Sequence, residues 1–514
     1  MTLDPNHAGS TGTTDPGPRT DTSTAPPGKG LRSGSVGLLG AVALGLSSTA
    51  PAYSLAVTLG LVTMTVGHLA PAALLIGFVP ILLTAFAFRE LNRDMPDCGT
   101  TFVWNTRAFG PWVGWLVGSW VPTMATLFAM TALAQVGATY LLAALGLDTL
   151  AGDDTAVTIT ALVLLGGATV LARRGLQIAT GVQYVLLALQ LVALFGLGVA
   201  AFARPGAAAP SPSWLNPFAF DGAGPFAEAV LLCLFIYWGW DALITVNEET
   251  SDADRVPGRA VLISTFVLLG TYLFTAFAAV GYAGTGTTGI GLGNPDNATD
   301  VLAALAPPLL GGAMATGVQL AVCVSALSAM LTCLVGSPRG FLSMTAHGAL
   351  PKAFGRVHPR YRTPAVGTVF FGAATAVALV VLKLASPRFL GDAILSIGLL
   401  IACYYGATAF ACVWHFRHRL SGSARDLLFK GVLPLLGGLM MLAALARSAY
   451  DMVDAAYGST SFHGVGGVFL LGVGAMALGL PVVVLIRARH PRFFRDGRTS
   501  VAPPTLTESP RNES

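Results

Sequence analysis

Long apolar runs, separated by short polar or glycine-rich segments, dominate the pattern of hydrophobic and polar positions between residues 37 and 487. Most of them are roughly 18–30 residues long, the length that an α-helix needs to cross a hydrocarbon core of about 30 Å. The pattern therefore predicts about twelve membrane-spanning helices. We place them at residues 37–65, 69–88, 111–143, 155–172, 178–202, 226–249, 259–283, 313–336, 364–384, 390–414, 429–448 and 465–487.

Composition supports this prediction. The 514 residues are 54% hydrophobic and 11% charged, whereas soluble domains carry about 25% charged residues. Little chain is left for a soluble domain, so we expect an all-α integral membrane protein whose main partner is the lipid bilayer. The net charge of +4 is small, and we expect no nucleic-acid partner.

Basic residues give the orientation, since cytoplasmic loops of membrane proteins are enriched in Lys and Arg. With the N-terminus inside, the cytoplasmic segments hold all of the 29 basic residues except Arg204, Lys383, Arg388 and Arg447. We therefore predict a multi-pass plasma-membrane protein with both termini in the cytoplasm. Residues 1–32 and 489–514 are polar and are predicted to be disordered tails on one transmembrane domain, 33–488.

The span at 226–249 contains the clearest candidate for chemistry. Its apolar first half leads into Tyr237-Trp-Gly-Trp-Asp241. A carboxylate near the bilayer centre costs at least ~2.5 kcal/mol, so Asp241 is by default a functional residue. Gly239 marks a point where the helix can break, and unpaired backbone is tolerated at that depth only against protein or a water-filled cavity.

The first span has an interruption of its own, because Pro51 removes a backbone donor directly after Ser47-Ser48-Thr49. Spans one and six lead two five-span halves, 37–202 and 226–414, which are followed by two further helices in 429–487. An odd number of spans gives the halves opposite orientations. Matching interruptions in inverted halves indicate the binding site of a secondary transporter.

The two breaks offer complementary surfaces to a zwitterion. Free N–H groups and the positive dipole end after Pro51 suit a carboxylate, whereas unpaired carbonyls near Leu46 and Tyr237 suit an ammonium group. We assign the substrate carboxylate, largely through backbone, to Ser47, Ser48, Thr49 and Ala50. We assign the substrate amine and side chain to the carbonyls of Ile236, Tyr237 and Gly239, with Trp238 or Trp240 packing on the side chain or gating the site.

Each assignment has a plainer alternative. Ser47, Ser48 and Thr49 are also typical of helices in which hydroxyls bond back to carbonyls. Asp241 is a coupling carboxylate or a contact for the substrate amine, or it is an N-cap of the inner half of span six, and these roles can coexist. At least one of Trp238 and Trp240 is expected to be ordinary packing.

Further polar residues extend the candidate site. On span eight, hydroxyls could face the break in span one as in a sodium site, although small polar residues also serve helix packing; they are Ser325, Ser328 and Thr332, followed by Cys333. Tyr404 and Tyr405 on span ten are candidates for an outer gate or for packing. Acidic residues from Glu248 to Asp254 lie at the cytoplasmic mouth, where a salt-bridged gate with Arg339 or Arg93 competes with a solvated charge cluster.

Three segments resemble the amino acid–polyamine–organocation (APC) superfamily of permeases. They are GLSSTAPAYSLAVTLG at 45–60, FRELNRDMPDCGTTFVWNTRAFGPWVGWLVGSW at 88–120 and GSPRGFLSMTAHGALPKAFGRVHPRYRTP at 336–364. The resemblance implies a LeuT-like five-plus-five inverted repeat with two extra helices, broken helices 1 and 6, and transport of amino acids or related amines. The chain departs from the family at Cys98–Phe102, where Gly-Gly-x-Tyr is usual, at His347, where an Asp often precedes Gly, and at Gln190, where some members carry a lysine that stands in for sodium.

Together these features predict a secondary active transporter that moves amino acids by alternating access, through proton-coupled symport or exchange. The alternatives are a polyamine or organic-amine permease or antiporter, and a transporter-like sensor without transport. The spans hold no HExxH, Walker or paired-carboxylate motif, so we expect no enzyme and no metal. No cofactor is expected beyond a coupling H⁺ or Na⁺, and a homodimer is compatible with this class.

Overall fold

The computed structural model describes residues 29–496 except 299 and 386–388, and this part of the chain is almost entirely helical. The first half contains α1 (Leu38–Thr49), α2 (Pro51–Val66), the 3₁₀ turn η1 (Gly67–Leu69), α3 (Ala70–Asp94), α4 (Thr101–Phe109), α5 (Pro111–Trp115), the π-helical η2 (Leu116–Trp120), α6 (Val121–Ala144), α7 (Asp148–Ala151), α8 (Asp154–Arg173), α9 (Leu176–Phe202) and the 3₁₀ turn η3 (Pro212–Leu215). The second half contains α10 (Ala223–Tyr237), the 3₁₀ helix η4 (Trp240–Glu249), α11 (Val256–Ala283), the 3₁₀ turn η5 (Pro295–Asn297), α12 (Val301–Leu310), α13 (Gly312–Ala346), the 3₁₀ turn η6 (Lys352–Gly355), α14 (Ala365–Ala385), α15 (Phe389–Phe416), α16 (Ala424–Asp426), the π-helical η7 (Leu427–Val432), α17 (Leu433–Asp451), α18 (Gly467–Arg489) and α19 (Pro491–Asp496).

Eleven segments of the described chain are long and apolar enough to cross a membrane, which confirms the predicted all-α membrane class. The first, Leu38–Asp94, has 57 residues; a straight helix of that length would be about 85 Å long, far more than a bilayer is thick. It is divided at Ala50 and again at η1, and it contains both predicted spans 37–65 and 69–88. The remaining segments coincide with the other predicted spans.

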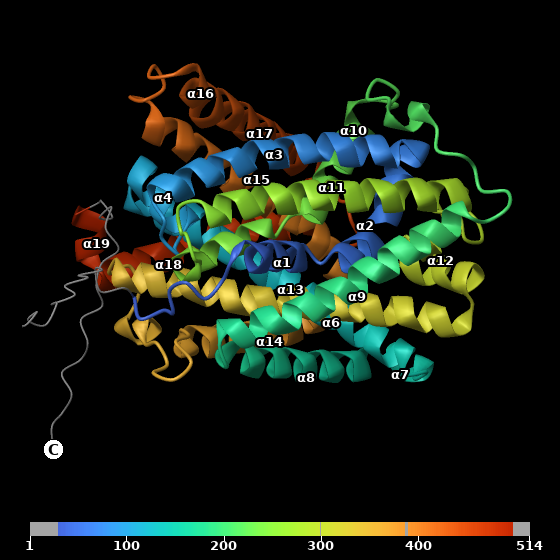
Figure 1. The fold of residues 1–514 in the computed structure, drawn as a ribbon, viewed down its shortest axis with the longest axis horizontal. Helices are drawn as coiled ribbons and strands as arrows, with labels where there is room; N and C mark the ends of the chain where they lie inside the picture. The colour runs from blue at the N-terminus through green and yellow to red at the C-terminus, as the bar shows by residue number, and fades with distance from the viewer. Residues whose placement is uncertain (1–28, 299, 386–388, 497–514) are drawn as a thin grey trace, which may run out of the picture.

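The long helices run side by side along the longest axis of the molecule, and the described chain begins and ends at the same end of the bundle (Figure 1). In the centre, α13 packs against α6 and α9, α15 against α17 and α6, and α11 against α1 and α3. Outer helices such as α8, α9 and α14 expose large apolar side chains, including Val163, Val192 and Val377. A contiguous apolar exterior of this kind is the surface that faces lipid.

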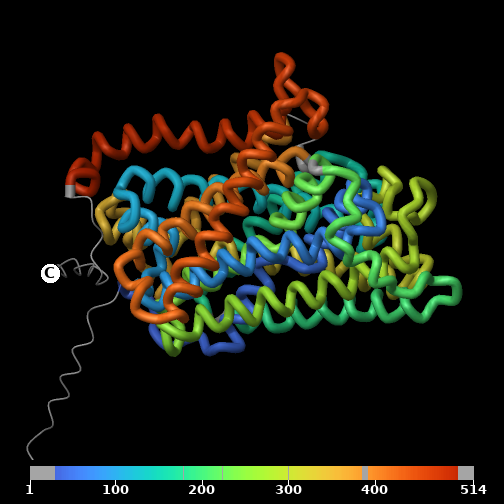
Figure 2. Tube along the Cα trace, turned by 90° about the horizontal axis from the view of Figure 1, so that it is seen from above, coloured from blue at the N-terminus to red at the C-terminus, as the bar shows by residue number. Residues whose placement is uncertain are grey.

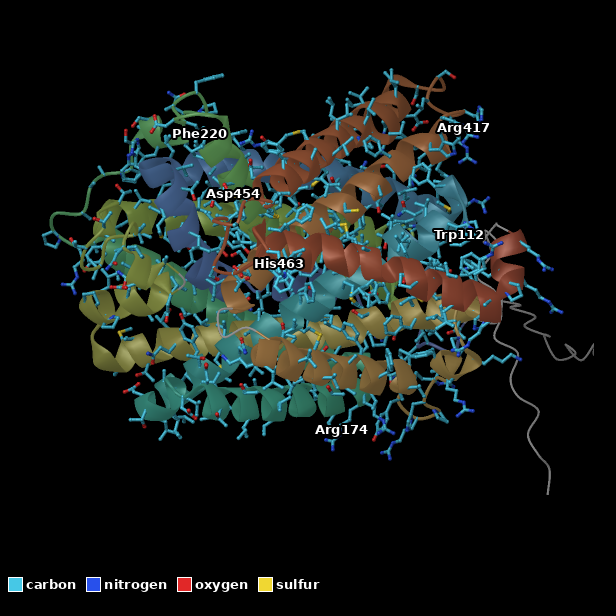
Figure 3. All side chains as sticks on the ribbon, turned by 180° about the vertical axis from the view of Figure 1, so that it is seen from behind. Trp112, Arg174, Phe220, Arg417, Asp454 and His463 are labelled. Atoms are coloured by element: carbon cyan, nitrogen blue, oxygen red, sulfur yellow. The ribbon has the colours of Figure 1, made fainter. Side chains whose placement is uncertain are left out.

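Short elements lie at the two ends of the bundle. Strands β1 (Ser461–Phe462) and β2 (Val465–Gly466) form an antiparallel hairpin between α17 and α18, with Phe462 opposite Val465. The buried carboxylate of Asp392 accepts bonds from the Ser459 amide at 2.7 Å and from its hydroxyl at 2.9 Å, which fastens the start of this hairpin to α15. Figure 2 shows α18 along one edge of the molecule, and Figure 3 places Trp112 and Arg417 toward one end and Phe220 toward the other.

The predicted end of span eight at residue 336 is wrong, because α13 continues through Pro338 to Ala346. A proline inside a helix removes one donor and weakens the turn before it. Here Arg339 Nη1 donates to the Val335 carbonyl in that same turn. The helix therefore extends through the segment that the sequence pattern assigned to a loop, and the Arg339 side chain packs along its own preceding turn.

Both predicted tails are partly structured. Lys29, inside the predicted tail 1–32, is 2% exposed, and the amides of Ser35 and Val36 donate to the Glu249 carbonyl at 2.8 and 3.0 Å. At the other end, α19 lies within the predicted tail 489–514, and its Phe493 stacks on Phe102 with ring centroids 5.7 Å apart. The rest of the predicted tails, 1–28 and 497–514, lies outside the described residues.

Candidate functional site

The first span breaks at a single residue. Helix α1 ends at Thr49, Ala50 adopts φ 48° and ψ 64°, and Pro51 opens α2. Proline suits the first position of a helix, where its missing N–H would have no intrahelical partner. A left-handed alanine costs roughly 1–2 kcal/mol, so surrounding contacts must hold this conformation. The break lies directly before Pro51, as the sequence predicted. Helix α1 ends at Thr49, three residues beyond Leu46, where the sequence analysis expected the unpaired carbonyls.

The sixth span breaks over two residues. Helix α10 ends at Tyr237, Trp238 is extended at φ −73° and ψ 152°, and Gly239 adopts φ 114°. Such a positive φ favours glycine because a Cβ would clash with the backbone. The chain then continues as η4 rather than as an α-helix. Each carbonyl of a 3₁₀ helix bonds three residues ahead rather than four.

The two breaks touch each other. A Cβ built on Gly239 would lie 2.8 Å from the Ser48 carbonyl oxygen and 3.3 Å from its hydroxyl. Real Cβ atoms essentially never come within 3.0 Å of such an atom. The lack of a side chain at residue 239 is therefore what lets the second break approach the first.

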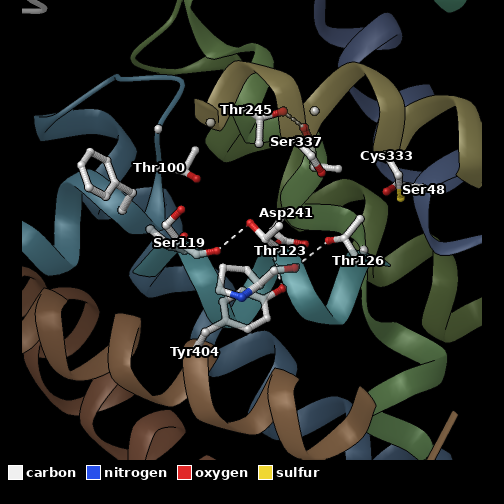
Figure 4. A pocket seen from close by; sticks show the side chains of 18 of the residues that line it. Ser48, Thr100, Ser119, Thr123, Thr126, Asp241, Thr245, Cys333, Ser337 and Tyr404 are labelled. Atoms are coloured by element: carbon white, nitrogen blue, oxygen red, sulfur yellow. Dashed lines mark hydrogen bonds between the residues drawn. The ribbon is translucent and has the colours of Figure 1, made fainter. Parts of the chain in front are cut away.

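A cavity of about 110 Å³ lies beside this contact. Five of the predicted site residues line it: Ser48, Trp238, Gly239, Asp241 and Tyr404. Figure 4 shows the side chains of Ser48, Asp241 and Tyr404 around this space, carried by three different elements, α1, η4 and α15. Cys333 of α13, which the sequence also singled out, lines it as well.

Asp241 provides the charge of the cavity. Its Oδ2 accepts the Tyr404 hydroxyl at 2.9 Å, and the Trp238 Nε1 donates to the oxygen of that hydroxyl. No Lys, Arg or His is among the described residues that line the cavity. A half-buried carboxylate without a cationic neighbour is costly unless a proton or a ligand cation neutralises it.

Span three contributes polar groups that the sequence analysis did not single out. Ser119, Thr123 and Thr126 line the cavity from η2 and α6, at the i, i+4, i+7 spacing that places residues on one helix face. The hydroxyls of Thr123 and Thr126 donate to carbonyls one turn earlier, at 2.7 and 2.8 Å. Their oxygens still have lone pairs, so they can accept bonds from a ligand. This spacing was the signal that would have found them.

The predicted carboxylate contacts divide into two groups. Thr49 donates to the Leu46 carbonyl at 2.8 Å, and the Ala50 amide donates to the Ser47 carbonyl at 3.2 Å, so these groups are satisfied within the break. By contrast, the hydroxyls of Ser47 and Ser48 are buried and have no partner among the described residues. Of these four residues, Ser48 lines the cavity.

The predicted amine contacts are also divided. The Ile236 carbonyl accepts the Tyr272 hydroxyl at 2.9 Å, so the protein itself occupies it. Tyr237 packs on Phe78, and Trp240 packs on Phe88, with ring centroids 5.5 and 5.1 Å apart. Neither Ile236, Tyr237 nor Trp240 lines the cavity. Between the two tryptophans, Trp238 therefore faces the cavity and Trp240 belongs to the packing.

Of the three predicted hydroxyls of span eight, Ser325 reaches the break in span one, where it accepts the Tyr53 amide at 3.2 Å, but none of the three lines the cavity. Gln183 of α9 donates to the Ser328 carbonyl at 2.8 Å and to the Thr332 hydroxyl at 2.7 Å, and it accepts the Ser328 hydroxyl. Ser325 donates to Gln190 at 2.5 Å. Amide side chains of span five thus satisfy these hydroxyls.

Buried ion pairs lie at the end of η4 that is remote from Asp241. Glu249 of η4 contacts Arg339 of α13 at 2.5 Å, and both side chains are almost completely buried. Beside this pair, Lys29 contacts Asp97 at 2.8 Å and Glu248 at 2.6 Å. The sequence analysis named Arg339 as a partner for this acidic cluster, but it did not foresee Lys29, which stood in a segment predicted to be disordered.

Replacing Arg339 with Met is expected to lower the stability by about 3–5 kcal/mol, because it leaves the Glu249 charge buried without its partner. The thermal unfolding midpoint of the purified protein measures this. The double variant Arg339→Met/Glu249→Leu is expected to regain most of the loss. The control Arg447→Met removes an exposed i, i+4 pair with Asp451 and is expected to change stability by less than about 1 kcal/mol. Equal losses in Arg339→Met and Arg447→Met would contradict this prediction.

These features together describe a multi-pass membrane transporter with a polar cavity between two broken helices. The family model of the amino acid permeases matches residues 36–463, so the chain belongs to this family. It is a transporter and not an enzyme, as the sequence predicted.

Curated relatives agree with this assignment. The chain is 25% identical to the low-affinity putrescine importer PlaP of Escherichia coli K12 over 409 residues, which cover 78% of this chain and 86% of PlaP. It is 26% identical to the uncharacterized transporter Rv1999c of Mycobacterium tuberculosis over 469 residues, or 88% and 93% of the two chains. The branched-chain amino acid permease BcaP of Bacillus subtilis is 27% identical over 199 residues, or 37% and 38%.

Proposed function

We propose that this permease carries a small amino acid across the cell membrane by alternating access, with both termini in the cytoplasm. The observation that carries this proposal is the contact between the two helix breaks. Beside it lies a cavity in which Asp241 is the one carboxyl group among the described lining residues. The ammonium group of the substrate pairs with Asp241. The Ser48 hydroxyl and backbone N–H groups at the breaks donate hydrogen bonds to the substrate carboxylate.

Asp241 is also the proposed coupling group. A proton and a substrate ammonium each neutralise the carboxylate, so the two compete for it, and binding one releases the other. Tyr404 keeps the carboxylate in place through the bond to Oδ2. A proton is the proposed coupling ion, because it neutralises the Asp241 carboxylate directly and needs no further oxygen ligands.

Alternating access requires that the two ends of the cavity open in turn. The ion pairs of Arg339 with Glu249 and of Lys29 with Glu248 link α13 and the segment before α1 to η4. Because η4 directly follows the break at Gly239, it can tilt while α10 stays in place.

A homodimer stays a prediction.

A second candidate substrate is an amine that lacks a carboxylate. The cavity holds a carboxyl group and several hydroxyl acceptors but no cationic side chain among its described lining residues. Such a lining suits a ligand whose polar groups are mostly N–H donors. The similarity to a putrescine importer supports the same candidate.

Uptake by proteoliposomes that contain the purified chain tests both candidates. Because the proton and the substrate compete for Asp241, the coupling is an exchange. We therefore expect an outward proton gradient, with an acidic lumen, to drive accumulation of at least one labelled amino acid or aliphatic amine, whereas a sodium gradient does not. Protein-free liposomes give the background. A chain that binds such a ligand but shows neither uptake nor exchange would be a sensor, and the transport proposal would then be wrong.

A further inference from the structure

The Lys29 side chain occupies a complete cage of acceptors. An ammonium group has three N–H donors, and Lys29 Nζ lies 2.8 Å from Asp97 Oδ2, 2.6 Å from Glu248 Oε1 and 3.6 Å from Cys98 Sγ. The Lys29 side chain has no exposed surface. The geometry is thus that of a bound primary ammonium ion and not of a surface salt bridge.

The rest of the protein holds the cage acceptors in place. Asp97 Oδ1 accepts the Gly99 amide at 2.7 Å and the Ser343 hydroxyl at 2.5 Å, which leaves Oδ2 directed toward Lys29. Glu248 Oε1 also accepts the Cys98 amide at 2.9 Å. The cage is therefore built by α13, η4 and the loop before α4, and Lys29 is its occupant.

The charges agree with this assignment. Burial alone would raise the pKa of Asp97, but the Lys29 ammonium and His347 outweigh it and hold that pKa well below its usual range. Burial raises the pKa of the Cys98 thiol, and the thiol donates to the Arg339 carbonyl at 3.4 Å. A protonated thiol is a poor ligand for a metal ion but accepts weakly from an N–H group.

The cage shares a wall with the substrate cavity. Cys98 lines the cavity together with Thr100 and Thr101, and its sulfur is also the third acceptor for Lys29. A solute that leaves Asp241 toward this end of the molecule therefore meets the cage next. The occupant is joined to the membrane domain through 30–37, a short segment that contains no helix.

We propose that Asp97, Cys98 and Glu248 form a second binding site of the permease, specific for a primary aliphatic ammonium ion, in which Lys29 is a tethered occupant that a free amine can replace. The site closes this end while Lys29 fills it. It does not depend on the identity of the transported substrate, because its ligand is defined by its own three acceptors.

Chemical rescue tests this site. Replacing Lys29 with Ala keeps Cβ and removes the atoms of n-propylamine, so n-propylammonium fits the space that remains. In a background where the other cysteines are replaced by Ala (233, 323, 333, 403 and 412), Cys98 is the one thiol. We expect N-ethylmaleimide to alkylate Cys98 at least about tenfold faster in Lys29→Ala than with Lys29 present, and millimolar n-propylammonium to reverse this. Neither tetramethylammonium, which has no N–H donor, nor uncharged 1-propanol should protect Cys98.

Matched variants decide between the outcomes. Lys383→Ala removes a partly exposed lysine paired with Asp154 and should leave Cys98 alkylation slow and insensitive to n-propylammonium. Glu248→Gln serves if Lys29→Ala does not purify as a folded protein, because it removes one of the two carboxylate charges. It should give an alkylation rate of Cys98 between those expected with Lys29 present and for Lys29→Ala, and n-propylammonium should slow this alkylation less than it does in Lys29→Ala. Unchanged alkylation, equal protection by 1-propanol, or protection by Cd²⁺ but not by n-propylammonium would each overturn the proposal. Ligand binding and alkylation are measured without transport, so failure of the amino acid transport proposal is a separate result.

Discussion

Replacing Asp241 with Asn is expected to abolish proton-driven accumulation of substrate in proteoliposomes, lowering the initial rate at least about tenfold, which corresponds to about 1.4 kcal/mol or more. Asparagine has nearly the same shape and can still accept the Tyr404 hydroxyl that Asp241 accepts at 2.9 Å. It carries no charge, so it neither pairs with a substrate ammonium nor exchanges a proton. The expected loss is therefore electrostatic and not a loss of packing.

Asp148→Asn is the control, because that carboxylate lies on an exposed turn, in α7. It should leave both the rate and its pH dependence as in the unmodified protein. The thermal unfolding midpoint of Asp241→Asn should not fall, since asparagine keeps the shape of the side chain and removes a half-buried charge. If Asp241→Asn kept both the rate and the pH dependence, Asp241 would have no coupling role. A role as N-cap would not replace it, because Gly239 is the N-cap of η4 and no side chain caps this helix.

The second large effect is expected from Gly239→Ala. The new Cβ would lie 2.8 Å from the Ser48 carbonyl oxygen and 3.1 Å from its carbonyl carbon, both backbone atoms that cannot rotate away. The positive φ of 114° adds a conformational cost of roughly 1–2 kcal/mol for an L-residue. The two breaks must then separate, and we expect substrate uptake to fall at least about tenfold.

Gly270→Ala is the matched control, because this glycine lies in α11 with a normal helical φ and its Cβ would meet nothing within 4 Å. There alanine is expected to stabilise the helix by roughly 0.5–1 kcal/mol and to leave uptake unchanged. Uptake and ligand-induced thermal stabilisation should be measured on the same samples. If Gly239→Ala transported as well as Gly270→Ala, contact between the breaks would not be needed for function.

The positions of the helix breaks could be predicted because their causes are local. Pro51 lacks an N–H wherever it lies, and Gly239 is the residue that most readily adopts a positive φ. Asp241 could be predicted for a similar reason, since a carboxylate within an apolar span is costly in any arrangement of the helices.

The residues around the cavity could be predicted only in part. Trp238 and Trp240 are two positions apart and have the same chemistry, but the backbone turn at Gly239 directs Trp238 to the cavity and Trp240 to Phe88. Ser328 and Thr332 were expected near the break, yet Gln183 from another span binds them. Thr123 and Thr126 were overlooked because hydroxyl residues in membrane helices commonly serve packing.

The sequence by itself determined the all-helical membrane class, the approximate bounds of the spans and the two points where helices break. These follow from the thickness of the bilayer and from the need to satisfy every backbone polar group within its own segment. Only the tertiary structure decided which face of each helix lines the cavity, and that Lys29 lies in a cage formed by Asp97, Cys98 and Glu248. The rotation of a helix about its axis, and the partner that a distant side chain finds, depend on contacts between segments far apart in the chain.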